Sequence, residues 1–347
     1  MCCARSAVAE PIAQTARSPA IQSTLLARPG GDGPVAVHAS FHLLNISSID
    51  DDAESVDFSG VLTLVWQDTR QAFDPVKEGV SEKVVSGAYQ FNEISPAWYP
   101  QVTLANTAGR YDSRTVLLRV KPDGTSKLME TVDAVAIVHL NLRPYPFDHQ
   151  RLEAVFEVSG FSVDEVVLVT DPGAATLDDT MIHLPQYALN GASASIRALN
   201  APYAGGTGAS SAFVVTINVA RRSLFMLRLV VLPLALIVML SWSVFWMDRS
   251  SLGDRMSVSF VGILTAVAYQ IVVGSTLPQI SYFTFMNGFL NVSFLTMSAS
   301  VVINLVVGAV DTHGHRRGDR IDRRCRWIFP LAYFGTIALA LAAFVFF

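Results

Sequence analysis

The sequence has few cysteines, and none of them lies in the segment 35–222. Of 347 residues only three are cysteine, namely Cys2, Cys3 and Cys325. No pair lies between residues 35 and 222, which excludes a disulfide framework for that segment. A segment of about 190 residues can bury a hydrophobic core without one.

Signatures of enzymes and of nucleic-acid binding are also missing. The sequence shows no nucleophile with a nearby base, no Gly-rich phosphate loop and no cluster with metal-ligand spacing. We therefore predict no enzyme activity, no cofactor and no metal. Residues 1–220 hold 14 Lys and Arg against 24 Asp and Glu, whereas the rest holds 11 against 5. An acidic polar half before a basic apolar half indicates a water-exposed domain on a membrane domain, without nucleic acid as a partner.

Residues 1–34 are rich in Ala, Arg, Ser, Pro and Gly and lack periodicity. We predict that this segment is disordered. It also lacks the apolar run of a signal peptide, so an export signal would have to lie outside it.

Residues 35–222 are expected to form an immunoglobulin-like β-sandwich. Short stretches rich in β-branched and aromatic residues alternate with turn signals such as the PDG at 122–124. The predicted strands are 35–45, 56–66, 101–105, 114–120, 126–131, 136–140, 151–157, 166–170, 182–199 and 212–221. Many short strands without a long helical pattern favour two packed sheets.

Residues 223–347 are expected to form a four-helix transmembrane domain. Four apolar segments, 229–247, 256–278, 283–310 and 327–347, approach the roughly 20 residues that a membrane helix needs. The arginines between the third and fourth segments predict a cytoplasmic loop, which places the sandwich outside. The fold class is therefore a β + α multi-pass membrane protein.

The second apolar segment carries polar and small residues along one side. The stripe, at helical steps of three and four, comprises Asp254, Ser257, Val261, Leu264, Ala268, Ile271 and Ser275. Such a stripe suits a helix that lines a water-filled pore, with the apolar middle as a gate that closes by dewetting. A buried helix in a larger bundle is the alternative.

Several spaced motifs resemble those of the pentameric ligand-gated ion channels, the Cys-loop receptor superfamily. RPYPFDHQ at 143–150 is similar to the family's Pro-Phe-Asp loop, and WQDTR at 66–70 and WYP at 98–100 match two further segments. Arg221, LPLALIVMLSWSVFW at 232–246, the Leu-Pro at 277–278 and RCRWIFP at 324–330 continue the resemblance. Val138 and Leu152 stand where animal members carry the cysteine pair, which points to the prokaryotic branch.

The resemblance implies roles for charged residues at the domain boundary. Asp148 and Arg221 match an ion pair that an acidic residue joins, here Asp51, and Arg222 is a neighbouring candidate. These residues would couple agonist binding to pore opening, and a static salt bridge is the alternative. Pro278 is expected to break the pore helix at its outer end, because proline cannot donate a helical hydrogen bond.

The resemblance also implies agonist and ion sites. Glu157 matches an acid that contacts amines, Phe161 lies near the same segment of the ligand pocket, and Tyr203 has the aromatic type expected in its loop. Glu54 matches a proton-sensing carboxylate. For each of these four residues ordinary structure is the alternative. In a pentamer Asp254 would form a carboxylate ring that favours cations. The neighbouring Arg255 should point about 100° away.

We therefore predict a homopentameric, cation-selective channel in a bacterial inner membrane, with the sandwich in the periplasm. Its partners would be the lipid bilayer, identical subunits, permeant cations and a small-molecule or proton agonist. The alternative is a membrane-anchored periplasmic sensor that conducts nothing.

Overall fold

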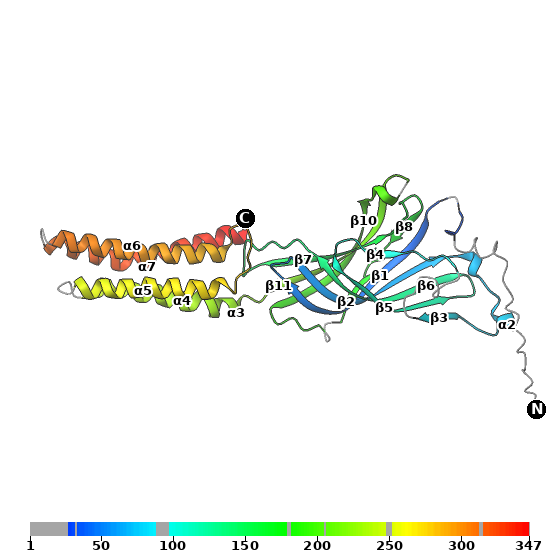
Figure 1. Ribbon diagram of the computed structural model, residues 1–347, viewed down its shortest axis with the longest axis horizontal. Coiled ribbons are helices and arrows are strands. Elements are labelled where there is room, and N and C mark those ends of the chain that lie inside the picture. Colours follow the sequence, from blue (N-terminus) through cyan, green and yellow to red (C-terminus); the bar gives the residue numbers. More distant parts are fainter. Residues whose placement is uncertain are drawn as a thin grey trace, which may run out of the picture.

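A computed structural model describes residues 27–31, 33–87, 97–178, 182–204, 206–247, 252–311 and 315–346. The molecule is elongated, with a β-sandwich at one end and helices at the other (Figure 1). Most of the segment 1–34, predicted to be disordered, lies outside the described residues. Within its described part, Arg28 donates to the carbonyl of Glu165 at 3.1 Å.

The sandwich consists of two sheets that pack face to face. The first has the order β3-β5-β6-β2-β1-β8, and β9 also pairs with β1. Its strands are β1 (Val35–Asp50), β2 (Ser55–Gln67), β3 (Lys83–Gly87), β5 (Thr107–Val120), β6 (Thr125–Ile137), β8 (Val166–Val169) and β9 (Ala175–Leu177). The second has the order β10-β11-β7-β4. Its strands are β4 (Val102–Leu104), β7 (His149–Val158), β10 (Tyr187–Asn200) and β11 (Ala209–Arg221).

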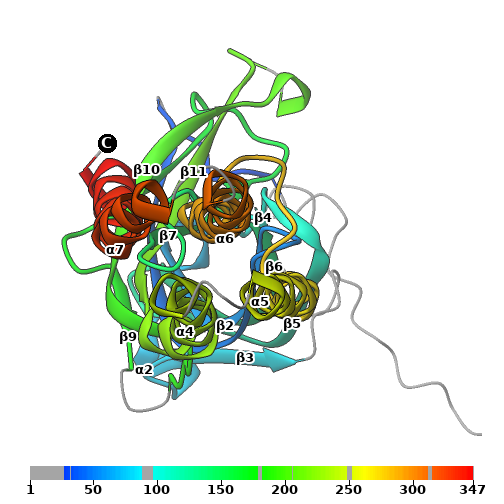
Figure 2. The ribbon, with the colours of Figure 1, turned by 90° about the vertical axis from the view of Figure 1, so that its left-hand side faces the viewer.

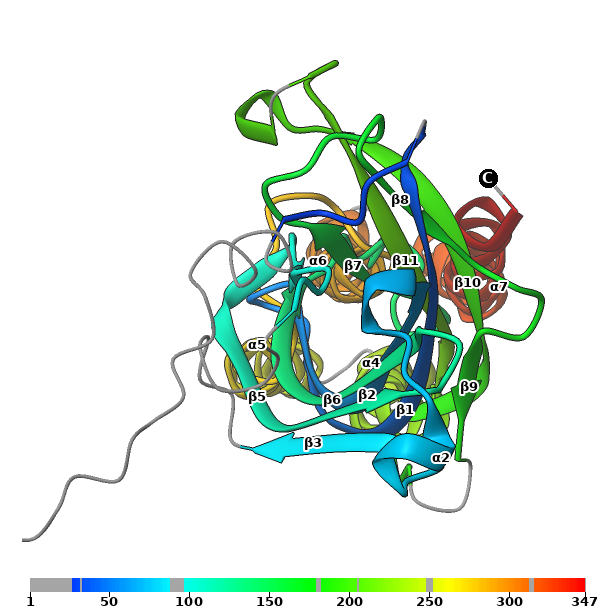
Figure 3. The ribbon, with the colours of Figure 1, turned by 90° about the vertical axis from the view of Figure 1, so that its right-hand side faces the viewer.

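Alternation of side chains produces this sandwich. Along β2 every second residue from Val56 to Trp66 is buried, because successive side chains of a strand point to opposite faces. Between the sheets Phe41 packs against Phe58 and Phe156 with ring centres 6.0 and 5.3 Å apart. Viewed from the sandwich end, the strands curve around this core (Figure 3).

Some strand predictions were wrong. The stretch 136–140 is no separate strand, because β6 continues to Ile137 and the amide of Val138 then bonds the carbonyl of Glu54. The strand predicted at 182–199 corresponds to β10, which begins at Tyr187 and not at 182. The edge strands β3 and β9, which pair with β5 and β1, were not predicted. Short one-turn elements are η1 (Thr69–Gln71), α2 (Pro75–Glu78) and η2 (Pro202–Ala204).

Within the described residues four helical spans follow β11, and each is long and apolar enough to cross a membrane. The first is a continuous run of α3 (Leu224–Met226), η3 (Leu227–Val231), α4 (Leu232–Trp242) and η4 (Ser243–Trp246). The others are α5 (Leu252–Gly274), α6 (Phe285–Asp311) and α7 (His315–Phe346). Seen end-on, α5 and α7 occupy opposite corners of the bundle, with α4 and α6 between them (Figure 2). The predicted β-sandwich with four membrane helices is confirmed.

Two helix boundaries differ from the prediction. α7 begins at His315, twelve residues before position 327, because helical structure continues through the arginine-rich stretch. α5 ends at Gly274, so Pro278 does not end it. The hydroxyls of Ser275 and Thr276 instead donate to the carbonyls of Val272 and Val273, where the helix stops.

Candidate functional site

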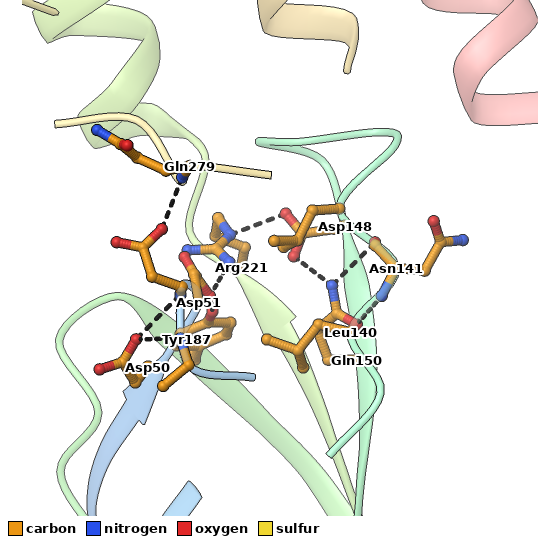
Figure 4. A network of polar contacts seen from close by, with 12 residues as sticks. Asp50, Asp51, Leu140, Asn141, Asp148, Gln150, Tyr187, Arg221 and Gln279 are labelled. Atoms are coloured by element: carbon orange, nitrogen blue, oxygen red, sulfur yellow. Dashed lines mark hydrogen bonds and ion pairs between the residues drawn. The ribbon is translucent and has the colours of Figure 1, made fainter. Parts of the chain in front are cut away.

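A cluster of charged and aromatic side chains joins the sandwich to the helices. Arg221, the last residue of β11, is the centre of this junction cluster, and its side chain is 3% exposed. Its Nε donates to Asp148 Oδ1 at 2.8 Å, and its Nη2 donates to Asp51 Oδ1 at 2.8 Å. Figure 4 shows the guanidinium between these carboxylates, which come from two different loops. One cation therefore ties together three segments far apart in sequence.

The remaining members complete the junction cluster. Gln150 donates from Nε2 to Asp148 Oδ2 at 2.7 Å, and the Tyr187 hydroxyl donates to Asp51 Oδ1 at 2.9 Å. The Arg221 guanidinium also lies over the rings of Tyr145 and Tyr187, 4.7 and 4.6 Å from their centres. The charge is thus enclosed by carboxylates and aromatic faces, which favour a cation.

Burial and charge shift the proton equilibria of this cluster. Burial alone would lower the pKa of Arg221, but the hydrogen bonds to Asp51 and Asp148 outweigh it and raise the pKa. Burial raises the pKa of Tyr145 to about 12, and the pKa of Tyr187 also rises through burial. Arg221 therefore stays charged and both phenols stay neutral at physiological pH.

The loop between α5 and α6 touches the sandwich beside the junction cluster. Asp52 Oδ1 accepts from the backbone amide of Gln279 at 2.6 Å. The Tyr282 hydroxyl donates to the carbonyl of Leu140 at 3.2 Å and accepts from the amide of Leu142 at 3.1 Å. Movement at the base of the sandwich can therefore reach the end of α5 through direct hydrogen bonds.

The structure brings together Asp51, Asp148 and Arg221, while Pro278 lies next to Gln279 in the contacting loop. Arg222, the other candidate, is exposed, and the ion pairs with Asp51 and Asp148 are made by Arg221 instead. Sequence reasoning gave no role to Asp52, Gln150 and Tyr187. It placed the loop 279–282 against the sandwich but did not predict the hydrogen bonds of the Tyr282 hydroxyl. Asp52 lies next to Asp51 in the acidic stretch DDDAE at 50–54, which could have marked it. No local pattern marks Gln150 or Tyr187 as a member of the cluster.

The predicted stripe on α5 lies on the open side of the helix. Asp254, Ser257, Val261, Leu264, Ala268, Ile271 and Ser275 are all exposed in the single subunit. Leu264 and Ile271 are 70% and 72% exposed. The opposite side of α5 packs into the bundle through Arg255, Ser259, Ala266 and Val273, which are all buried. The exposed apolar stripe is thus a surface that lipid, a pore or another subunit must cover.

Two of the three predicted ligand residues touch. The Tyr203 hydroxyl donates to Glu157 Oε1 at 2.5 Å, and Ser210 donates to the same oxygen at 2.5 Å. The hydrogen bond to Glu157 raises the pKa of Tyr203. Phe161 instead packs edge-on against Trp98, with ring centres 6.0 Å apart. Tyr203 is 68% exposed, so this end of the sandwich offers an accessible phenol beside a buried carboxylate.

Two further carboxylates differ in their surroundings. Glu54 lies 3.8 Å from His139 Nδ1 on the surface of the sandwich, within the turn after β1. Glu130 lies on the core side of β6, is 6% exposed and accepts from the Tyr111 hydroxyl at 3.3 Å. Burial raises the pKa of Glu130, and the hydroxyls of Ser113 and Tyr111 only partly offset this.

Comparison with known proteins agrees with this architecture. Residues 24–223 match the neurotransmitter-gated ion-channel ligand binding domain, and residues 230–319 match the neurotransmitter-gated ion-channel transmembrane region. The chain belongs to the neurotransmitter-gated ion-channel family. This family comprises pentameric ligand-gated channels rather than enzymes, so the resemblance inferred from the motifs is confirmed.

Three relatives are each identical to the chain at about a quarter of the aligned residues. The chain is 27% identical to a proton-gated ion channel of Gloeobacter violaceus over 92% of its own length and 85% of the relative's. It is 25% identical to the gamma-aminobutyric acid receptor subunit rho-3 of Homo sapiens over 84% of its length, and 24% identical to pH-sensitive chloride channel 2 of Anopheles gambiae over 73%. It spans only 62% and 42% of those two animal proteins.

Proposed function

We propose that this protein is a homopentameric, cation-selective channel of a bacterial inner membrane, with its sandwich in the periplasm. The observation that carries the proposal is the exposed stripe of α5, with a carboxylate at one end, hydroxyls near both ends and apolar residues between. Five copies of this surface around an axis would enclose a pore with an apolar gate and a ring of Asp254 at its inner mouth. The arginines before the apolar part of α7 support the orientation.

Cation selectivity rests on the charges at the start of α5. Asp254 is exposed, whereas Arg255 is 1% exposed and faces the bundle. A carboxylate ring without a compensating arginine attracts cations. One relative is named a chloride channel, which makes anion selectivity the second candidate.

Gating is proposed to run through the junction cluster. Agonist binding near Glu157 and Tyr203 would move the base of the sandwich, and Arg221 would pass this movement to α3 and α4. The contact between Asp52 and Gln279 would pass it to the end of α5. The name of the Gloeobacter relative makes protons one agonist class to test, with Glu54 as a candidate sensor; a small molecule is the other.

Recordings from the purified protein in liposomes test this proposal. Under a KCl gradient we expect agonist- or acid-evoked currents that reverse near the potassium equilibrium potential. Tyr203→Phe should weaken activation by a small molecule while leaving assembly intact, because the side chain is largely exposed. Absence of current under every pH and ligand tested, with Leu264→Ser included to weaken the gate, would favour the non-conducting sensor. Reversal near the chloride potential would favour an anion channel.

A further inference from the structure

A buried ion pair crosses the bundle at the end farthest from the sandwich. Arg255 Nη1 and Nη2 donate to Asp322 Oδ2 and Oδ1 at 3.2 and 3.1 Å. The side chains of Arg255 and Asp322 are 1% and 4% exposed. Because α5 and α7 occupy opposite corners of the bundle (Figure 2), this two-pronged contact spans its interior.

Asn304 of α6 completes the arrangement from a third helix. Its Oδ1 accepts from Arg255 Nη2 at 3.1 Å, and its Nδ2 donates to the Ser259 hydroxyl at 3.1 Å. Ser259 lies one helical turn along α5 from Arg255, so the amide fixes two positions on the buried side of the helix. A bidentate carboxylate and an amide define both the position and the plane of a guanidinium.

The position of Arg255 matters because of the residue before it. Asp254 is exposed on the predicted pore side, and only one peptide bond separates it from the arginine. An arginine side chain is long enough to reach back toward the end of its helix when nothing holds it. Five such cations beside five carboxylates would leave the mouth close to neutral.

We propose that Asp322 and Asn304, which lie on helices outside the stripe, set the ion selectivity of the channel by holding Arg255 inside the bundle. This inference rests on the proposed pore along α5. Asp322 and Asn304 are positioning residues, since they act on ions only through Arg255. The negative charge of Asp254 is then left uncompensated at the inner mouth.

The size of the effect follows from Coulomb's law in salt solution. Five guanidinium groups about 10 Å from a permeating ion, screened at physiological ionic strength, change its local concentration by about threefold. Cations fall and anions rise by this factor, so the K⁺/Cl⁻ permeability ratio should drop by up to about tenfold.

The decisive experiment compares reversal potentials of the reconstituted channel under a KCl gradient. Asp322→Asn should lower the K⁺/Cl⁻ permeability ratio, and the double variant Arg255→Gln, Asp322→Asn should restore it, because no cation is left to release. Asp322→Glu keeps the charge and should resemble the wild type. A merely structural role would reduce the amount of assembled protein without moving the reversal potential.

The outcomes separate the inference from the proposed function. A cation-selective wild type whose ratio is unchanged by Asp322→Asn overturns the inference and leaves the channel intact. An anion-selective wild type overturns the proposed selectivity. In that case, a further shift toward chloride in Asp322→Asn that the double variant reverses still supports the inference that Arg255 is held inside the bundle. Should Asp322→Asn fail to assemble, Asn304→Ala tests the inference with the ion pair kept. Loss of one contact of Arg255 should lower the K⁺/Cl⁻ permeability ratio by a smaller factor, and an unchanged ratio overturns the role of Asn304.

Discussion

Replacing Asp148 by asparagine removes one charge from the junction cluster with almost no change of shape. The side chain of Asp148 is 0% exposed, and its two oxygens accept from Arg221 and Gln150. An amide has one oxygen and one NH₂ group, so one of these donors would face another donor. Arg221 would keep only Asp51 as a carboxylate partner.

The expected loss of stability is large. Removing one partner of a buried ion pair costs about 3–5 kcal/mol, and the remaining pair with Asp51 places this case near 3 kcal/mol. For a domain of this size 1 kcal/mol shifts the thermal midpoint by about 2–4 °C, so the midpoint should fall by about 6–12 °C. Asp51→Asn is the matched control, because its carboxylate is 18% exposed and water can replace part of the interaction. It should lower the midpoint by less than half as much.

The assay is thermal unfolding of the solubilised protein, followed by agonist dose–response curves of the same variants in liposomes. If the junction cluster couples the two domains, Asp148→Asn should also move the half-maximal agonist concentration or proton concentration. Equal midpoints for the two variants, or a fall below about 2 °C for Asp148→Asn, would refute the assignment of Arg221 to a buried, tightly paired state.

Four further predictions concern the core, the gate and the loop contact. Glu130→Gln should stabilise the sandwich near pH 7 but not near pH 4. Because the pKa of Glu130 is raised in the folded protein, the stability of the wild type falls as pH rises through that pKa, whereas the glutamine variant does not titrate. Thermal midpoints of both proteins across pH would detect the difference. Leu264→Ser should shift the closed–open equilibrium toward open by about 1 kcal/mol or more per subunit, seen as current without agonist, whereas a wild-type-like closed state would contradict an apolar gate. In the same stripe Val261→Thr should raise open probability. Tyr282→Phe removes the hydroxyl that bonds the carbonyl of Leu140, so it should lower the free energy of unfolding by about 1 kcal/mol and weaken gating. Unchanged dose–response curves would argue against this contact as a coupling route.

Strand and helix prediction succeeded where a period alone carries the information. The alternation in β2 and the long apolar segments of the helices follow from geometry that every strand and every membrane helix obeys. The predictions failed where the chain ends an element without a local signal. α7 starts at His315 inside a charged stretch, and α5 stops at Gly274 without using Pro278.

The sequence by itself determined the two-domain architecture, the helical phase of the stripe and the charged residues available at the boundary. Tertiary structure decided which of these residues meet. The choice of Arg221 over Arg222 depends on the face on which β11 ends, and the contact of Tyr187 with Asp51 joins residues 136 positions apart. Likewise, helical spacing turned Arg255 away from Asp254, but only the packing of three helices supplied Asp322 and Asn304 to hold it. Local periodicity fixes the direction in which a side chain points, whereas its partner depends on long-range packing that no short stretch of sequence encodes.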